Sequence, residues 1–541
     1  MEKSKVMQIV KLKNHSPTFH DVWRKFNDIT KNIAFSMVLD LFPITPLEMK
    51  TLQNAIRLAE PFYQFPSETQ LLEIIIPRIY NQVKQKVLNT IKSDLLKGVK
   101  SVALTIDGWN GRSIADYMSV TIHYWTEEYE CRHLLLQLES LPRTWNTAQD
   151  LFHLIENVLL KYGLSEERTE SVHIVTANGN NIVKAISMSD KWIRIPCFAR
   201  LFQQTVDDVL RSFPHLDELV TKCRYLLAAI WTKSATDVEF HKSKLHSSCI
   251  LDDIVPSWNS IFDIFDSLLK LRSTLQIFLE EADLPAKGLA EADWETIESY
   301  VQMFSLLKQA SVLFSEEAYP PLSLYLPTIR GILELMESMN LNNQLSVQLI
   351  RSICSRFGHI NTNQSMIIAM VLDPRFKTRL LAEDEQFAVF DMVKGKMLSV
   401  DRDERQATRG DTDRIEHFAD QSLKTYFTKI ETKKAADDTD GRLAEAELTY
   451  YLCQNVVPMN TAINQWWKGN CRHFPKLAKL ARIYLSVPAV QVCSERAFPN
   501  KRGFIVDSRA ELLTSQVNVL DLMRISFLNS NLGQFRDDVD L

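Results

Sequence analysis

The sequence has few glycines, no paired cysteines and no long apolar run. Its 541 residues include 14 glycines, while 45% are hydrophobic and 24% are charged. This composition is typical of a globular, mostly helical protein, and it excludes collagen-like and disordered chains. No window approaches the length of an apolar membrane span, and the N-terminus lacks the apolar core of a signal peptide. We therefore expect an intracellular protein without a membrane partner.

Eight cysteines are present, but none has the spacing of a zinc ligand pair. They stand singly at positions 131, 197, 223, 249, 354, 453, 471 and 493. A structural zinc site needs cysteines or histidines at short, regular spacing. We therefore expect no zinc finger, no other metal site and no cofactor, and we expect reduced thiols.

Charge gives no global sign of a nucleic-acid partner. The 62 Lys and Arg residues are outnumbered by 67 Asp and Glu residues, which gives a net charge of −5. Proteins that hold DNA on a broad basic face have the opposite balance. Any DNA contact must therefore come from a local patch.

The chain begins with a helical pattern. Apolar residues recur at three- and four-residue spacing up to about residue 100, and Pro61 and Pro66 interrupt the pattern. We predict a helical N-terminal module over residues 1–100, in which one helix ends before the two prolines and another starts after them.

At residue 101 the apolar period changes from 3.6 to 2, which predicts strands. Two helices interrupt them, at residues 146–164, with Thr147 as N-cap and Gly163 as C-cap, and at residues 180–188. The five predicted strands cover residues 101–107, 117–125, 131–141, 171–177 and 191–197. The order βββαβαβ, which starts with an antiparallel meander, is the one used by ribonuclease H-like folds. Residues 101–197 are therefore predicted to form the first part of such a core.

Helical periodicity returns after residue 197, and no strand signal interrupts it for a long stretch. The segment 399–442 is the most polar of the chain, and we expect it to be a partly disordered, flexible insertion. The predicted fold is α/β with large all-α parts. A ribonuclease H-like core is interrupted by a helical insertion over residues 198–465, and residues 466–541 complete the core and add a C-terminal segment.

Two strand ends raise the question of catalysis. Asp107 ends the first predicted strand, in TIDGWNG, and Ala177 ends the fourth, in VTANGNN. An aspartate before Gly-Trp is often only a turn residue. In ribonuclease H-like nucleases, however, carboxylates from the first strand, the fourth strand and a late helix hold two divalent cations for phosphoryl transfer.

Seven collinear motifs carry a more specific signal. They are TIDGWNG, VTANGNNIVKA, IPCFAR, PSWNSIF, MVLDPRFK, WWKGNCRHFPKLAKLARIYLSVPA and CSERAFPNKRGFIVDSRAELL. In this order and at this spacing they resemble the hAT superfamily of transposases, and more narrowly the domesticated BED-finger (ZBED-type) hAT proteins of animals. The resemblance extends from about Phe35 to Leu522. It implies the ribonuclease H-like fold and a hAT-type C-terminal dimerisation segment.

The resemblance also implies where the acidic triad of the family falls in this chain. Asp107 matches the first carboxylate and Glu495 the third, whereas the second falls on Ala177. The family's Cys-x-x-His motif is altered too, because Arg200 stands where the histidine follows Cys197. A methyl group offers no ligand, and two carboxylates supply too little negative charge for two close divalent cations. We therefore expect no enzyme: the chain should neither cut nor join DNA.

Four positions are candidates for DNA contact. Trp258 matches a tryptophan that stacks on an unpaired base in active relatives, although a packed core aromatic would give the same pattern. Lys501, Arg502 and Arg509 lie close to Glu495 in the sequence and form a local basic cluster. Such a cluster is also typical of a solvated surface.

The C-terminal segment has apolar residues at helical spacing. The candidates for dimerisation are Leu512, Leu513, Val517, Leu520 and Met523. Taken alone, such a stripe is equally typical of a monomer core. With the resemblance to the hAT dimerisation segment, it predicts self-association into a dimer or a higher oligomer.

No BED finger motif precedes the helical module, so we expect the family's usual DNA-reading element to be absent. The resemblance then implies an inactive, domesticated transposase-like protein in the nucleus, with the cytoplasm as the alternative. It would act as a DNA- or chromatin-associated regulator through oligomerisation and through partners such as BED-finger relatives or other nuclear proteins. Two alternatives stay open: a protein-interaction scaffold that binds no DNA, and a residual transposase or nuclease.

Overall fold

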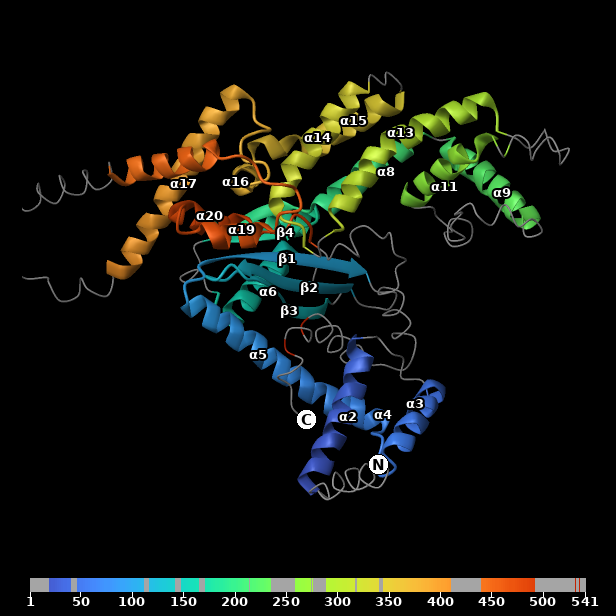
Figure 1. The fold of residues 1–541 in the computed structure, drawn as a ribbon, viewed down its shortest axis with the longest axis vertical. Coiled ribbons are helices and arrows are strands. Elements are labelled where there is room, and N and C mark those ends of the chain that lie inside the picture. The colour runs from blue at the N-terminus through green and yellow to red at the C-terminus, as the bar shows by residue number, and fades with distance from the viewer. Residues whose placement is uncertain are drawn as a thin grey trace, which may run out of the picture.

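The computed structural model places a five-stranded sheet between two groups of helices (Figure 1). The smaller group precedes the sheet in the sequence, and the larger group follows it. The structure describes residues 19–39, 46–110, 116–141, 147–164, 171–213, 215–234, 258–273, 275, 289–316, 319–339, 344–409, 439–491, 531 and 535.

The N-terminal residues form the predicted helical module. Its elements are α2 (Phe19–Leu39), α3 (Pro46–Ala59), α4 (Glu68–Gln70), the π-helical turn η1 (Leu71–Ile75) and α5 (Ile76–Leu96). Pro61 and Pro66 stand between α3 and α4, as predicted, because proline cannot continue a helix. The long helix α5 runs from this module to the sheet and buries an apolar stripe from Ile79 to Ile91 (Figure 1).

All five predicted strands are present. They are β1 (Ser101–Asn110), β2 (Asp116–Trp125), β3 (Cys131–Leu141), β4 (Ser171–Thr176) and β5 (Trp192–Pro196). β1, β2 and β3 form the predicted antiparallel meander, whereas β4 pairs with β1 and with β5 in parallel. The strand order is β3-β2-β1-β4-β5, so the sheet is mixed and β1 is its central strand.

The helix between β3 and β4 begins and ends as its sequence predicts. α6 (Ala148–Lys161) starts after Thr147, whose hydroxyl accepts a hydrogen bond from the Asp150 N–H. In return the Asp150 carboxylate accepts one from the Thr147 N–H, which completes a capping box. Gly163 follows the helix with a φ of 77°, a conformation that favours glycine. α7 (Asn180–Ile186) is the second predicted helix.

The two faces of the sheet bury different cores. Leu104 and Ile106 of β1 pack in one core with residues of α5 and α6. Ala103, Val175 and Ile195 pack in the other, with the helices that follow β5. Successive side chains of a strand point to opposite faces. The nearly continuous apolar run of β1 therefore reflects burial on both sides.

The larger helical group contains the amphipathic segments that the sequence predicts. Its elements are α8 (Phe198–Arg211), α9 (Leu216–Ser234), α11 (Trp258–Lys270), α13 (Glu291–Leu313), η4 (Leu322–Leu324), α14 (Tyr325–Ser338), α15 (Gln344–Phe357), η5 (Gly358–Thr362), α16 (Gln364–Leu372), α17 (Glu383–Arg409), a helix over residues 439–453, α19 (Ile463–Asn470) and α20 (Pro475–Tyr484). None of the described helices combines the length and the apolar character that a membrane crossing would require.

The polar segment differs from its prediction at both ends. Residues 399–409, expected to be irregular, are the last turns of α17, and residues 439–442 already belong to the next helix. The sequence over 401–409 contains three Arg residues and one each of Glu, Gln and Ala, and all four residue types have high helix propensity. Polarity alone therefore does not mark where the helix ends. Residues 410–438 lie outside the described part.

The buried helix α16 lies within the predicted helical insertion, but no amphipathic pattern marks it in the sequence. Every residue from Ser365 to Leu372 is buried, so the helix has no polar face and its sequence has no apolar period. Asn363 caps its start by accepting a hydrogen bond from the Met366 N–H at 3.1 Å. α16 packs between η4 and α20 and thus joins the insertion to the helices next to the sheet.

The turn after α16, in the motif MVLDPRFK, is held by buried charged side chains. Asp373 is fully buried and accepts a hydrogen bond from Arg375 at 2.7 Å. Lys377 is 2% exposed, and its ammonium donates to the carbonyl oxygen of Tyr451 at 2.7 Å and to two further carbonyls just after it. The motif is therefore a structural junction between α16 and the helix over residues 439–453.

Candidate functional site

Asp107 and Ala177 lie at the same edge of the sheet, on neighbouring parallel strands. The register pairs Thr105 of β1 with Val175 of β4. Two residues further along, Asp107 lies within β1, and Ala177 directly follows the last residue of β4. Asp107 is 7% exposed and Ala177 is half-buried. The structure thus brings together the two positions that the sequence singles out. The prediction that Asp107 ends its strand is wrong, because pairing with β2 extends β1 to Asn110.

A glutamine from the distant C-terminal region contacts Asp107. The Gln491 side-chain amide donates to Asp107 Oδ1 at 3.0 Å, and the Gln491 backbone N–H donates to Cys197 Sγ at 3.3 Å. Gln491 is 3% exposed. A buried amide is therefore fixed against the carboxylate of the central strand. The sequence analysis did not select Gln491, although it stands only four positions before Glu495.

The segment that carries Gln491 is held between the sheet edge and η4. The Phe198 N–H donates to the Ala489 carbonyl oxygen at 2.9 Å, and the Ala489 N–H donates to the Pro320 carbonyl oxygen at 2.7 Å. The Leu322 N–H donates to the Val487 carbonyl oxygen at 2.8 Å. These backbone bonds fix the chain just before Glu495 at the carboxyl edge of the sheet. Glu495 itself lies outside the described residues.

The surroundings of Ala177 are rich in hydrogen-bond donors. The Arg194 guanidinium of β5 donates to the Asn178 side-chain oxygen, next to Ala177. Burial lowers the pKa of Arg194, but this group starts from a value so high that it stays charged at neutral pH. Burial also raises the pKa of the Cys197 thiol, which is therefore neutral. Near the second position of the triad, the chain thus offers a cation and amides in place of a carboxylate.

No group of three His, Cys, Asp or Glu side chains with metal-ligand geometry occurs among the described residues. Around Asp107 the contacts above come from an amide, and hydrogen-bond donors do not bind cations. The chemistry of the described side chains therefore suits retention of one buried carboxylate by hydrogen bonds.

Trp258 is the first residue of α11 and lies in the helical core. Its side chain is 3% exposed, and its ring packs 5.9 Å from that of Phe202 and 6.2 Å from that of Phe304. Of the two interpretations that the sequence leaves open, this conformation has the packed core aromatic. A nucleic-acid base cannot reach the ring without a rearrangement of α11.

The other candidate residues lie outside the described part of the chain. They are the basic residues Lys501, Arg502 and Arg509 and the apolar residues Leu512, Leu513, Val517, Leu520 and Met523. Their roles remain predictions.

A buried histidine pair on the sheet is a feature that the sequence analysis missed. His123 of β2 pairs with His133 of β3 in the antiparallel register, and their Nδ1 atoms are 2.7 Å apart. His123 Nε2 is 2.9 Å from the Thr105 hydroxyl oxygen, and Tyr319 stacks on His133 at 4.7 Å between ring centroids. Burial lowers the pKa of His133 to about 4 and that of His123 well below its usual range. Both imidazoles are therefore neutral at physiological pH.

Comparison with known proteins identifies relatives of the chain. Residues 447–525 match the hAT family C-terminal dimerisation region. All five apolar candidates for dimerisation fall within this match. Similarity to whole proteins extends much further along the chain than this region does.

Two human proteins and one transposase illustrate that similarity. Human zinc finger BED domain-containing protein 4 is 22% identical over 91% of this chain and 44% of its own length. Human zinc finger protein 618 is 23% identical over 84% of this chain and 45% of its own length. The Hobo transposase of Drosophila melanogaster is 22% identical over 76% of this chain and 68% of its own length. The chain thus spans less than half the length of these two human relatives. From the dimerisation region and these alignments, the chain is similar to hAT transposase-derived proteins, including the zinc finger BED domain-containing type.

Proposed function

We propose that the chain is a catalytically inactive hAT transposase-like protein with a ribonuclease H-like core. It acts in the nucleus as a DNA- or chromatin-associated regulator, through self-association and partner binding. The observation that carries this proposal is Ala177 beside Asp107 at the carboxyl edge of the sheet. In-line phosphoryl transfer with two metal ions needs carboxylates at both strand ends, and this chain has one.

The fold assignment within this proposal is supported by the strand order β3-β2-β1-β4-β5. An antiparallel meander followed by two parallel strands, with an acidic residue on the central strand, suits a ribonuclease H-like core. Similarity to the Hobo transposase supports the same assignment.

The loss of catalysis is tested with supercoiled plasmid, in Mg²⁺ and separately in Mn²⁺. We expect no nicking above the level of a buffer blank, and we expect Asp107→Ala to behave like the wild-type protein. Metal-dependent nicking that Asp107→Ala abolishes would mean that the chain is a residual nuclease.

Self-association is supported by the match of residues 447–525 to the hAT dimerisation region. Light scattering of the purified chain at micromolar concentration should give twice the monomer mass or more. The double variant Leu513→Glu/Leu520→Glu, which places charges in the apolar stripe, should lower that mass to the monomer value. A wild-type monomer at micromolar concentration contradicts this part of the proposal.

DNA association is tested by fluorescence anisotropy with a random-sequence duplex at several salt concentrations, without divalent cations. Phosphate contacts release condensed counterions, so the logarithm of the affinity should fall linearly with the logarithm of the salt concentration. Substituting Lys501, Arg502 and Arg509 by glutamine should reduce that slope. No binding at low salt would favour the scaffold alternative, in which the protein joins partners and binds no DNA.

A further inference from the structure

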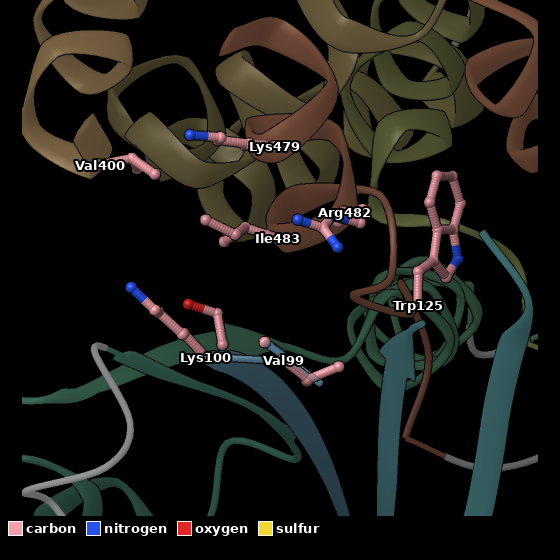
Figure 2. A pocket seen from close by; sticks show the side chains of 9 residues that line it. Val99, Lys100, Trp125, Val400, Lys479, Arg482 and Ile483 are labelled. Carbon is pink, nitrogen blue, oxygen red and sulfur yellow. The ribbon is translucent and has the colours of Figure 1, made fainter. Parts of the chain in front are cut away.

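A small cavity lies at the start of β1, where α5 ends and α20 crosses the sheet (Figure 2). Its volume is about 40 Å³, and its walls come from the α5–β1 connection, the end of β2, α17 and α20. The cavity sits at the opposite end of β1 from Asp107, so it is separate from the carboxyl edge described above.

Three cationic side chains line this cavity. Lys100 precedes β1, whereas Lys479 and Arg482 lie one helical turn apart on α20. Figure 2 shows Lys100 on one side of the hollow and the other two side chains on the opposite side. No carboxylate belongs to the lining in the part of the chain that the structure describes. Three cationic side chains thus meet at one cavity in a protein with net charge −5.

Glu127 is the ionic partner of Arg482, but the contact is loose. Its carboxylate oxygen lies 3.6 Å from Arg482 Nη1, beyond hydrogen-bond distance, and its side chain is half exposed. An arginine has five N–H donors, so this contact leaves the guanidinium free to bind a second acceptor. Arg482 itself is only 20% exposed, which strengthens any interaction it makes with an anion.

A buried hydroxyl in the same wall has no partner among the described residues. Ser101 is 7% exposed, and its Oγ atom forms no hydrogen bond. An unsatisfied buried hydroxyl costs free energy, so this atom is a second and independent sign that the cavity holds a polar ligand. Gly98 forms the adjacent wall with a φ of 113°, and the Glu127 carboxylate lies so close to it that a side-chain carbon at position 98 would collide with it.

We propose that this cavity binds a terminal phosphate group. Lys100, Lys479 and Arg482 supply the positive charge and the charge-assisted hydrogen bonds, and the Ser101 hydroxyl is a further donor. One water needs about 10–15 Å³ of such space, so the cavity has room for a single tetrahedral oxyanion. A terminal phosphate presents three unesterified oxygens to these donors, whereas a backbone phosphodiester of DNA presents two. The group therefore belongs to a free phosphorylated molecule or to a phosphorylated strand end.

The first test measures the thermal midpoint of the full chain with inorganic phosphate, against chloride at matched ionic strength. A ligand that binds only the native state raises this midpoint, so phosphate should raise it in a saturable way. Lys479→Gln and Arg482→Gln should each weaken binding by about ten-fold or more, because each removes a charged donor. Lys92→Gln is the matched control, since Lys92 is exposed on α5, and it should bind phosphate as the wild type does. An equal rise in phosphate and chloride, or the same affinity in all variants, would overturn the proposal.

A variant that should bind phosphate more tightly separates a loss of binding from a loss of folding. Glu127→Gln removes the anion that competes for Arg482, so phosphate should bind more tightly than to the wild-type protein. Unchanged or weaker binding in a folded Glu127→Gln protein contradicts the proposed role of Arg482.

The second test distinguishes the sources of the phosphate. A 5′-phosphorylated trinucleotide, its unphosphorylated twin and a blunt unphosphorylated duplex are compared as competitors of inorganic phosphate. Competition by the phosphorylated trinucleotide places a strand end in the cavity, whereas competition by inorganic phosphate analogues alone, with none by any DNA, indicates a small phosphorylated molecule. Competition by the unphosphorylated duplex at the same strength as the phosphorylated trinucleotide would refute the terminal-phosphate assignment. Because the cavity is remote from Asp107 and Ala177, these outcomes are independent of the nicking assay.

Discussion

The side-chain amide of Gln491 donates a 3.0 Å hydrogen bond to the carboxylate of Asp107, across 384 positions of sequence. The bond joins the central strand of the sheet to the segment that follows α20. It occupies one oxygen of the carboxylate with an N–H donor. This contact gives Asp107 a structural role in the fold.

Removing the acceptor should therefore destabilise the protein. Asp107→Ala leaves the buried Gln491 amide without this partner, and we expect the free energy of unfolding to fall by about 1–3 kcal/mol. Asp107→Asn should cost less, because its side-chain oxygen can still accept the bond. Urea denaturation measures both. A double-mutant cycle with Gln491→Met isolates the pair, and a coupling of zero would mean that the contact contributes nothing.

Several elements of the fold can be predicted because local rules decide them. The five strands follow from the period of apolar residues, and Thr147 and Gly163 mark the ends of α6 through local capping. The neighbourhood of Asp107 and Ala177 also follows from the order of strands and helices, because the carboxyl ends of parallel strands meet at one edge.

Other features depend on where distant segments meet, and local rules do not contain that information. Gln491 reaches Asp107 only through the backbone bonds of residues 487–491 to η4 and α8. The helix α16 is buried on all sides, so its sequence shows no alternation of apolar and polar residues. The pairing of His123 with His133 needs the exact strand register, which a bulge at Leu136 of β3 shifts.

The buried histidines should make the protein sensitive to acid. In the folded state the pKa of His133 and of His173 is about 4, lowered mainly by burial, whereas an unfolded histidine has a pKa near 6.5. Between these values the unfolded state binds more protons, so stability falls as the pH falls. Each of these histidines should cost up to about 3 kcal/mol between pH 6.5 and pH 4.

Denaturation by urea at a series of pH values measures this loss. His133→Gln should remove part of the pH dependence, whereas His153→Gln should not, because His153 is exposed on α6. A free energy of unfolding that stays constant from pH 6.5 to pH 4.5 would contradict the neutral, buried assignment.

Lys377 should be one of the most sensitive positions in the helical group. Its backbone has a φ of 51°, which is strained for a residue with a side chain. Burial lowers the pKa of its ammonium to about 8, yet the group stays mainly protonated at pH 7. Its three acceptors lie at and just after the end of the helix over residues 439–453, where a cation is favourable.

Lys377→Met should therefore lower the free energy of unfolding by about 3 kcal/mol, because charged hydrogen bonds to buried carbonyls are lost. Lys394→Met is the matched control. Lys394 of α17 pairs with Glu445 of the helix over residues 439–453. Both side chains are partly exposed, and such pairs contribute at most about 1 kcal/mol to the free energy of unfolding. An equal loss of unfolding free energy in the two variants would show that the burial of Lys377 adds nothing to its contribution.

Trp258 offers a test that separates a core role from DNA contact. Its ring is enclosed by Phe202 and Phe304, so Trp258→Ala should destabilise the protein by about 3–5 kcal/mol through the cavity it leaves. Trp258→Phe keeps an aromatic ring, so it should lower the free energy of unfolding by less. It should also leave the DNA affinity within about two-fold of the wild-type value, because a buried ring makes no base stacking, which on an exposed ring is worth about 1–3 kcal/mol. Trp294→Phe, at a buried site on α13, is the matched control for stability. The contrary outcome is that Trp258→Phe weakens DNA binding ten-fold while Trp294→Phe does not, although both variants unfold at the same urea concentration. In that case Trp258 leaves the core to contact DNA, and the packed arrangement describes only the DNA-free protein.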